Sequence, residues 1–375
     1  MSVPNYPLGQ GFRPYLLRQL ANIVGEGNLP QHKIEHVGFM NFLQSQNKPE
    51  ILRLNNTAGH LQAVQVKYLQ RLTEEFTGTN EGNVCSHAYF EPYHETTANL
   101  TSFRFVPLYL GDEIVAQYED DASRTLSVGA PPTMIMNEML ERIMTAANAI
   151  IGGVRTDLLT SLTIGNNRVT GNANAQTINF ELDTNLLPLD NGMTKILTDY
   201  SINLGAGKPE IVGSGLIHNF FLQQVAKGVA QSGLNTAIEA AECKFYYDQK
   251  ANDILGANQF VVIEPNTVQI VEYMQYTGFK AGAKPGSSIF GTLALPMQVG
   301  QDVLPIEFDY QLKYVDCPTE YIDQYYGNTM LLQKGWTCIL SKKCGIFQIP
   351  ADAYNGIDPM LGVNGVFRYS ATNIA

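Results

Sequence analysis

One long amphipathic helix is the feature of this sequence that most limits its fold. Between residues 131 and 162, apolar residues recur every three or four positions, which is the period of a helix with one buried side. These positions are Ile135, Met139, Ile143, Ala147, Ile150, Val154, Leu158 and Leu162. The polar residues of the opposite side are Glu138, Glu141, Arg142, Thr145, Asn148, Arg155 and Thr156. At about 1.5 Å per residue the helix would be a rod of about 45 Å. Gly152 and Gly153 mark a point where it would be weakened or kinked. A rod of this length predicts the backbone of an extended building block.

Strand and turn signals dominate the rest of the 375 residues, which include 33 glycines and 18 prolines. Alternating or continuous apolar runs predict strands. Their ranges are 60–71, 101–110, 210–213, 260–263, 306–316, 336–340 and 346–349, and residues 268–276 are predicted to form a further short element. Lys342 and Lys343 are predicted to form the turn between the last two strands. Shorter helices are predicted at 13–23, 37–43, 194–204 and 217–230, and hairpin-like stretches at 77–97 and 113–125. The pattern predicts an α+β chain.

The low charge content suggests a surface that is covered by partners. Charged residues make up 16% of the chain and apolar residues 45%, whereas about a quarter of an average domain is charged. No apolar run approaches the roughly twenty residues that span a bilayer, so no membrane partner is predicted. The five cysteines contain no CxxC pair, and they are interpreted as reduced thiols of a protein made in the cytoplasm.

The net charge of −11 is unevenly distributed. Residues 1–71 carry seven basic and three acidic groups, whereas residues 72–123 carry ten acidic groups and a single arginine, Arg104. A basic arm followed by an acidic loop favours pairing between copies, because opposite charges steer association. The candidate contact residues are Arg13, Arg18, Glu91, Glu95, Glu119, Asp120 and Asp121. The alternative is two solvated surfaces without a partner.

One catalytic motif is present, the HxxEH pattern of His32, Glu35 and His36. On a helix, the two histidines would share a face and bind zinc, with Glu35 as the base of a metallohydrolase. Pro30 immediately precedes the motif, which lies in an irregular region and has no evident third ligand. Surface histidines are therefore the favoured interpretation.

The other candidate sites for metal or phosphate binding have weaker support in the sequence. The possible metal ligands Cys85, His87, Glu91, His94 and Glu95 match no closed zinc spacing and fit a solvated loop tip. Residues 284–288 lack the order of a phosphate-binding loop, and the glycines of 213–215 fit a tight turn from strand to helix. The sequence predicts no catalytic residue, no metal and no cofactor, and hence a protein that is not an enzyme.

The order of these elements resembles the major capsid proteins of tailed bacteriophages, which share the Hong Kong ninety-seven fold. The resemblance implies an α+β subunit with an N-terminal arm, an extended β-hairpin loop, a long spine helix, a peripheral-domain sheet and a mixed axial domain. In this sequence the arm would be residues 1–58, the extended loop with its flanking strands 59–126 and the spine helix 127–165. The axial domain would be 166–278, and the peripheral strands and C-terminal segment 279–375.

The resemblance also implies a function. The chain would be a structural protein that self-assembles as hexamers and pentamers into an icosahedral shell around double-stranded viral DNA. It would be assembled in the host cytoplasm and found in the virion. The DNA contact would be non-specific, through the basic arm. Portal, scaffold or decoration proteins remain open as partners. An encapsulin-like nanocompartment shell is the nearest alternative, and the HxxEH metallohydrolase a distant one.

Overall fold

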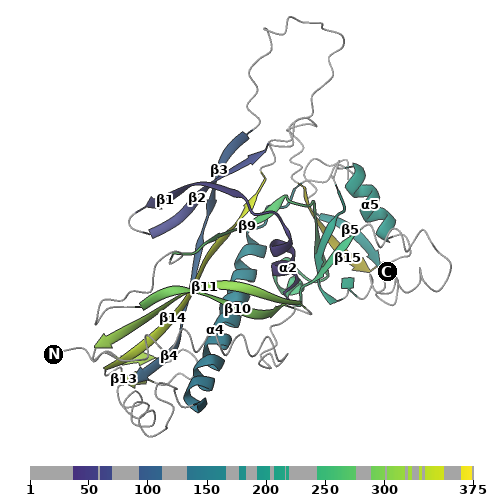
Figure 1. The fold of residues 1–375 in the computed structure, drawn as a ribbon. Helices are drawn as coiled ribbons and strands as arrows, with labels where there is room; N and C mark the ends of the chain where they lie inside the picture. The colour runs from purple at the N-terminus through teal and green to yellow at the C-terminus, as the bar shows by residue number, and fades with distance from the viewer. Residues whose placement is uncertain are drawn as a thin grey trace, which may run out of the picture. The chain divides into compact units, whose positions relative to one another are not determined.

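The computed structural model is an α+β chain built mainly of strands (Figure 1). It describes residues 37–57, 60–69, 93–111, 133–165, 177–182, 192–202, 207–215, 217–218, 243–275, 289–299, 302–316, 320–322, 329–331, 334–349 and 365–373. The chain divides into two compact units. The first comprises 1–34, 102–154 and 272–343, and the second comprises 35–101, 155–271 and 344–375. The domain boundaries expected from the sequence stay a prediction.

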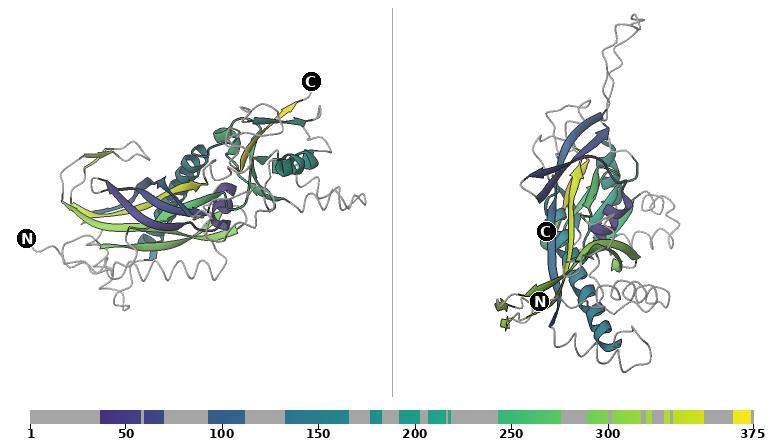
Figure 2. Two further views of the ribbon diagram at one scale, coloured as in Figure 1. Left: turned by 90° about the horizontal axis from the view of Figure 1, so that it is seen from above. Right: turned by 60° about the vertical axis from the view of Figure 1, so that its left-hand side comes forward.

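The long helix is confirmed as α4, Thr133–Thr160, which runs through Gly152 and Gly153 without a break (Figures 1 and 2). Its predicted apolar side is buried at every position whose side chain is described, from Ile143 to Leu162. Gly153 has a packing role, because an added Cβ would lie 3.3 Å from the ring of Phe103. Arg155 differs from the prediction, since it is buried and not on the polar side.

Most residues of a sheet of long strands belong to the first unit. Its order is β10-β11-β14-β4, and β9 also pairs with β14. The strands are β4 (Thr101–Gly111), β9 (Val268–Tyr273), β10 (Ile289–Val299), β11 (Asp302–Asp316) and β14 (Lys334–Gln348). The alternation predicted for β11 is confirmed, because Ile306, Phe308 and Tyr310 are all buried. A two-stranded sheet of β12 (Glu320–Ile322) and β13 (Thr329–Leu331) also forms.

The predicted turn at Lys342 and Lys343 is wrong, because β14 passes through both lysines as one strand. Lys342 is 0% exposed, and its Nζ lies 2.7 Å from a carboxylate oxygen of Glu272. The same ammonium donates a hydrogen bond to the carbonyl oxygen of Glu307, at 3.0 Å, and lies over the ring of Phe308. These partners compensate the charge within the sheet, so the two polar residues do not mark a turn.

In the second unit, β1 (Glu50–Thr57), β2 (His60–Leu69) and β3 (Tyr93–Asn99) form an antiparallel sheet in that order. The prediction for 60–71 is confirmed. Two expectations are corrected. Residues 50–57, assigned to an irregular arm, pair with β2, and 93–97, assigned to a loop tip, belong to β3. Both strands are polar, and pairing with β2 supplies the partners that their composition does not reveal.

A second sheet in this unit has the order β5-β15-β8-β6-β7 and mixes parallel with antiparallel pairs. Its strands are β5 (Thr177–Leu182), β6 (Glu210–Gly213), β7 (Lys244–Tyr247), β8 (Gln259–Ile263) and β15 (Val366–Asn373). The predicted strands at 210–213 and 260–263 are confirmed. Helix α5 (Gly192–Ile202), predicted at 194–204, contributes Ile196 and Tyr200 to a core that includes Phe260 and Tyr369.

Asp248 joins three distant segments of the second unit. Its carboxylate accepts hydrogen bonds from the backbone N–H of Phe39, at 3.2 Å, and of Lys250, at 3.0 Å. Phe39 lies in the first turn of α2 (Gly38–Ser45), whose N-cap residue Val37 provides no side-chain cap. Lys250 is the N-cap of α8 (Ala251–Leu255). The guanidinium of Arg155 lies 3.9 Å from the carboxylate, and both side chains are almost fully buried. Asp248 therefore supplies a helix cap from 209 residues away.

A buried carboxyl group predicts how stability depends on pH. Tyr369 donates a hydrogen bond to Asp199, and both side chains are buried. Burial raises the pKa of Asp199, opposed by that hydrogen bond and by the charge of Lys195. Between the ordinary pKa and the raised one, the folded chain holds a proton that the unfolded chain has lost. Stability therefore falls as pH rises through this window.

Asp199→Asn removes this ionisation. We expect the variant to have a higher urea midpoint than the unsubstituted protein at pH 7. The difference should shrink as pH falls through the window and disappear below the ordinary pKa of an aspartate. Asp253→Asn, at an exposed position, serves as the control. A variant that is less stable at pH 7, or a difference that does not change with pH, would contradict the assignment.

The described cysteines Cys243, Cys338 and Cys344 are free thiols. Burial raises the pKa of Cys338 to about 12, which keeps it protonated at neutral pH. Among the residues described, no helix combines the length and the apolarity needed to cross a membrane.

Candidate inter-subunit contact site

The β1-β2-β3 sheet carries a row of alternating charges at one of its ends. Glu50 of β1 is the register partner of Lys67 of β2, and Lys67 is the register partner of Glu95 of β3. Glu50 and Glu95 are exposed and Lys67 is half-buried. Gln65 donates a side-chain hydrogen bond to the Glu95 carboxylate. Opposite charges on directly paired strands attract, so the row stabilises the sheet and leaves one surplus negative charge.

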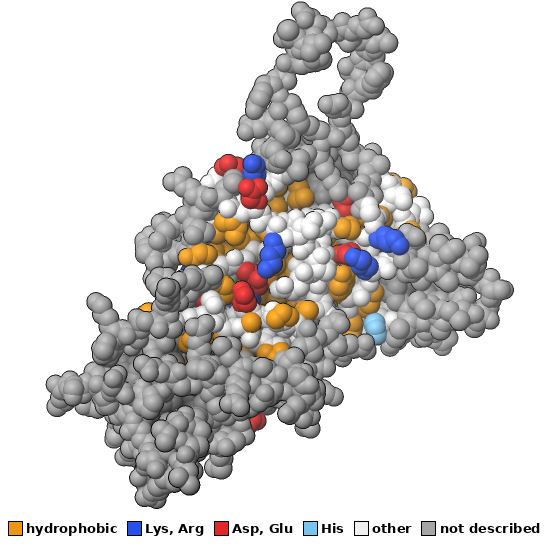
Figure 3. Space-filling model, viewed as in Figure 1, with side chains coloured by type: hydrophobic (Ala, Val, Ile, Leu, Met, Phe, Trp, Pro, Cys, Tyr) orange, Lys and Arg blue, Asp and Glu red, His pale blue; other side chains and the backbone are white. Residues whose placement is uncertain are grey.

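This end of the sheet adjoins the long excursion of the chain from β2 to β3, since Leu69 pairs with Tyr93 there. Val64, Val66 and Ala98 are buried, while Glu95 and Thr97 are exposed. The sheet therefore has one packed and one solvent-facing side. Charged side chains of both signs lie next to one another over these strands in Figure 3. Such a surface offers electrostatic contacts.

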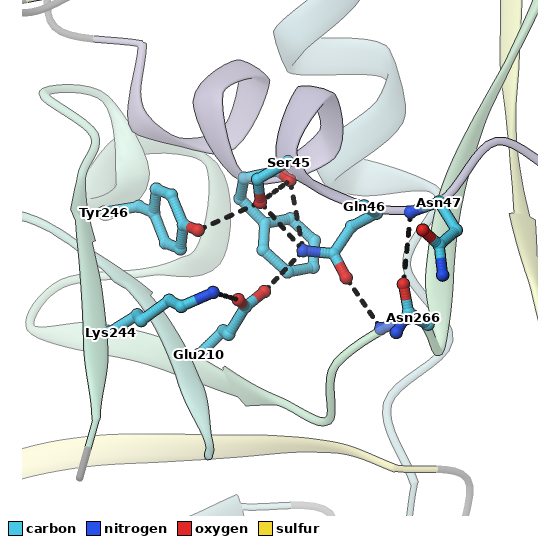
Figure 4. A network of polar contacts seen from close by, with 8 residues as sticks. Ser45, Gln46, Asn47, Glu210, Lys244, Tyr246 and Asn266 are labelled. Atoms are coloured by element: carbon cyan, nitrogen blue, oxygen red, sulfur yellow. Dashed lines mark hydrogen bonds and ion pairs between the residues drawn. The ribbon is translucent and has the colours of Figure 1, made fainter. Parts of the chain in front are cut away.

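A polar network fixes the chain where it passes from α2 to β1 (Figure 4). The side-chain amide of Gln46 donates to the carboxylate of Glu210, and its oxygen accepts a hydrogen bond from the backbone N–H of Asn266, at 2.6 Å. The N–H of Asn47 donates to the side-chain oxygen of Asn266, at 3.1 Å. Gln46 and Glu210 are buried, which makes the network a fixed anchor for the segment leading into β1.

Lys244 and Tyr246 also lie beside Glu210. Lys244 Nζ lies 3.0 Å from Glu210, and the hydroxyl groups of Tyr246 and Ser45 are 3.0 Å apart. The hydrogen bond and charge of Glu210 raise the pKa of Lys244, and burial raises the pKa of Tyr246. Lys244 is therefore charged and Tyr246 protonated at neutral pH. This arrangement positions the backbone and provides neither a nucleophile nor a free base.

Glu95 is the one predicted contact residue that the structure describes. Arg13, Arg18, Glu91, Glu119, Asp120 and Asp121 lie outside the described residues, as do His32, Glu35 and His36 of the HxxEH pattern and residues 284–288. Of the loop cluster, His94 and Glu95 are consecutive in β3, whereas Cys85, His87 and Glu91 are not described. Within the described ranges, no three potential metal ligands gather.

The glycines of 213–215 have the structural role that the sequence favoured. β6 ends at Gly213, where an added Cβ would lie 3.0 Å from Cβ of Phe260 and 3.4 Å from Cβ of Ile217. The N–H of His218 donates to the carbonyl oxygen of Ser214, which marks a helical turn. Close packing explains the small residue here.

The sequence does not reveal the partners of Glu95 or Glu210. Gln46 lies 164 residues from Glu210 and 220 from Asn266 along the chain. The local signal was the strand character of residues 60–71, which implied a neighbouring strand but not its identity.

No protein-family model matches the sequence, and no curated protein matches it. Among solved structures, the chain is similar to one titled for Mycobacterium phage Adephagia, at 10% identity and a TM-score of 0.42, over 92% of this chain and 91% of that one. It is similar to the Cyanophage A-1(L) capsid asymmetric unit, at 10% identity and 0.42, over 91% and 94%. It is also similar to the capsid of Myoviridae phage XM1, at 12% identity and 0.37, over 88% and 94%.

Proposed function

We propose that this chain is the major capsid protein of a tailed phage. In this proposal, copies assemble as hexamers and pentamers into an icosahedral shell that encloses double-stranded DNA. The protein belongs to the virion and acts as a structural subunit, not as an enzyme. Assembly takes place in the host cytoplasm, and portal, scaffold or decoration proteins are its candidate partners.

The observation that carries the proposal is the order of the elements. A three-stranded sheet follows α2, and 23 residues, 70–92, separate its strands β2 and β3 in the sequence. The 28-residue helix α4 follows. The mixed sheet comes next, interrupted by the long strands β10, β11 and β14. This order corresponds to the extended loop, spine helix, axial domain and peripheral strands expected from the resemblance.

The contact site follows from the charge distribution. Glu95, with Glu91, Glu119, Asp120 and Asp121, would form the acidic partner, and Arg13 and Arg18 the basic one, on a neighbouring copy. The exposed carboxylate of Glu95 beside the loop between β2 and β3 supports this assignment. The basic excess of residues 1–71 would also offer the non-specific contact to packaged DNA.

The test is electron microscopy of the purified protein, expressed alone and with a candidate scaffold. Closed shells, or rings of five and six subunits, are expected. A monodisperse monomer under both conditions would overturn the proposal. Shells that enclose a protein cargo in place of DNA would instead identify a nanocompartment.

A charge exchange tests the contact. Arg13→Glu with Arg18→Glu should abolish assembly, and adding Glu91→Arg with Glu95→Arg should restore it. Asp253→Arg, exposed on α8, is the matched control and should leave assembly unchanged. If the arginine-to-glutamate variant forms normal shells, these residues are not part of the contact between copies. The proposal of a shell would still stand.

A further inference from the structure

Three exposed lysines of the second unit meet at one end of its mixed sheet. Lys48 lies between α2 and β1, Lys208 lies two residues before β6, and Lys244 is the first residue of β7. All three residues are exposed. They come from separate parts of the chain, and together they form what we call the lysine cluster.

Backbone pairing brings Lys208 and Lys244 to the same end of the sheet. The N–H of Lys244 donates to the carbonyl oxygen of Pro209, the residue after Lys208, at 3.0 Å. Lys244 is also the register partner of Glu210 in the parallel pair of β6 and β7. Because parallel strands begin at the same end of a sheet, the two lysines stand side by side at the starts of neighbouring strands.

The turn at Pro265 and Asn266 connects Lys48 to this place (Figure 4). The N–H of Asn47, the residue before Lys48, donates to the side-chain oxygen of Asn266, at 3.1 Å. Pro265 Cγ lies 3.5 Å from the position that a Cβ would take at Gly207, the residue before the second lysine of the cluster. The chain segments that carry these two lysines therefore both contact the same turn.

The carboxylates at this end of the sheet are buried. Glu210 and Glu264 are each 1% exposed, whereas the side chain of Lys244 is 60% exposed. Glu264 directly follows Ile263, which is the register partner of Glu210. The next exposed carboxylate along the chain is that of Glu50, two residues after the first lysine of the cluster. The sheet end therefore presents mainly ammonium groups to solvent, although the chain as a whole carries a net charge of −11.

Glu210 fixes the position of one of these ammonium groups. Lys244 Nζ donates a hydrogen bond to one carboxylate oxygen of Glu210, at 3.0 Å, and the other oxygen accepts one from the side-chain amide of Gln46. The hydrogen bond and the charge of Glu210 raise the pKa of Lys244, so the lysine is charged at neutral pH. An ammonium group has three donors, and the exposed side chain leaves room for a second anion.

The other two lysines have interactions within the chain as well. Exposed ion pairs contribute little to stability, because solvent and salt screen them. A polyanion that presents many charges at once can therefore compete for Lys48 and Lys208.

We propose that the lysine cluster contacts the phosphate backbone of double-stranded nucleic acid, in addition to the contact offered by the basic arm. The inference rests on the proposed function, in which the shell encloses double-stranded DNA. A duplex carries one negative charge per about 1.7 Å of its axis, so a compact group of cations meets phosphates in any register along it. The contact is therefore independent of base sequence.

The chemistry of the cluster favours a phosphate backbone over an acidic protein segment. All three cations are lysines, whose ammonium groups are point charges. Ordered pairing with carboxylates favours the planar guanidinium of arginine, which binds them through two parallel hydrogen bonds. A cluster without arginine fits a diffuse contact with a continuous row of charges.

The salt dependence of duplex binding tests the inference. The probe is a fluorescently labelled DNA duplex of mixed sequence, titrated with the unassembled whole chain from about 50 to 200 mM salt. Each phosphate contact contributes about 0.9 to the slope of log K against log salt concentration. Combining Lys48→Ala, Lys208→Ala and Lys244→Ala should therefore make this slope less steep by about 2–3. The affinity at the lower salt concentration should fall at least about tenfold.

A second variant leaves the buried Glu210 with its partner. Lys48→Glu combined with Lys208→Glu keeps Lys244, so it should fold with an unchanged melting temperature. It should also make the slope less steep, by about 2. An unchanged slope in this variant and in the triple alanine variant would overturn the inference.

A matched control removes the same number of positive charges from the first unit. Arg104→Ala, Arg142→Ala and Lys343→Ala together should change the slope by less than about one. If this control flattens the slope as much as the cluster variant does, overall charge governs binding and the inference is wrong.

Shell formation separates the cluster from the proposed function. If the triple alanine variant loses assembly but keeps its binding to the duplex, the cluster holds a neighbouring protein chain, which would overturn the inference. A flattened slope in a protein that never forms shells would support the nucleic-acid contact and overturn the proposed function alone.

Discussion

Asp248→Ala is expected to lower the free energy of unfolding by about 3–5 kcal/mol, the range for breaking a buried ion pair from one side. The variant leaves the buried guanidinium of Arg155 without its 3.9 Å carboxylate partner. It also removes the acceptor for the backbone N–H groups of Phe39 and Lys250 at the starts of two helices. The urea-unfolding midpoint, followed by circular dichroism, measures the loss.

A double-mutant cycle separates the charge from the caps. Arg155→Met in the Asp248→Ala background should recover part of the loss, because it removes the buried cation that has lost this carboxylate, while the two N–H groups still lack their acceptor. Asp253→Ala is the matched control, since this exposed carboxylate lies in the first turn of the short helix α8. Its effect should stay below about 1 kcal/mol. Equal losses for Asp248→Ala and Asp253→Ala would refute the role assigned to Asp248.

Gly345→Ala is expected to be the most disruptive single-methyl change in the second unit. The added Cβ would lie 1.9 Å from the carbonyl oxygen of Asn99 and 3.1 Å from its carbonyl carbon. These are backbone atoms at the junction of β3 and β4, and they cannot move as the end of a flexible side chain can. Overpacking usually costs about 1–3 kcal/mol, and occasionally more; we expect about 3 kcal/mol here.

Gly152→Ala provides the opposite case with the same chemical change. Apart from the neighbouring backbone of the helix itself, no atom of the described residues lies within 4 Å of the Cβ position at Gly152, in the middle of α4. Because alanine favours a helix interior over glycine by about 1 kcal/mol, this variant should unfold at a higher urea concentration. A Gly345→Ala variant as stable as Gly152→Ala would show that β14 can move away from the β3–β4 junction at little cost.

Local periodicity explains which parts of the fold could be predicted. α4 and β11 each repeat their pattern over enough residues to identify the element and its buried face. β10 was not predicted, because Gly291 and Pro296 interrupt its alternation, and only the pairing with β11 shows it as one strand. Gly291 is accommodated there by the ring of Tyr310, which fills the space of the missing side chain.

Long-range partners explain the errors and the omissions. Lys342 resembled a turn residue until Glu272, 70 positions earlier in the sequence, provided its counter-charge. Arg155 was assigned to the polar side of α4, but Asp248 stabilises it in the interior. The candidate contact site was predicted from charge counts alone, which identified Glu95 but neither its strand nor its neighbour Lys67.

The position of β15 has a consequence for biosynthesis. This strand, Val366–Asn373, lies between β5 and β8 in its sheet. Until it emerges from the ribosome, β5 has no neighbour in that sheet and β8 has one open side. The mixed sheet therefore closes only after nearly all of this sequence has been translated. Nascent chains would therefore contain an incomplete sheet until synthesis reaches these residues. Truncation before Val366 should accordingly yield aggregating chains and not smaller soluble subunits.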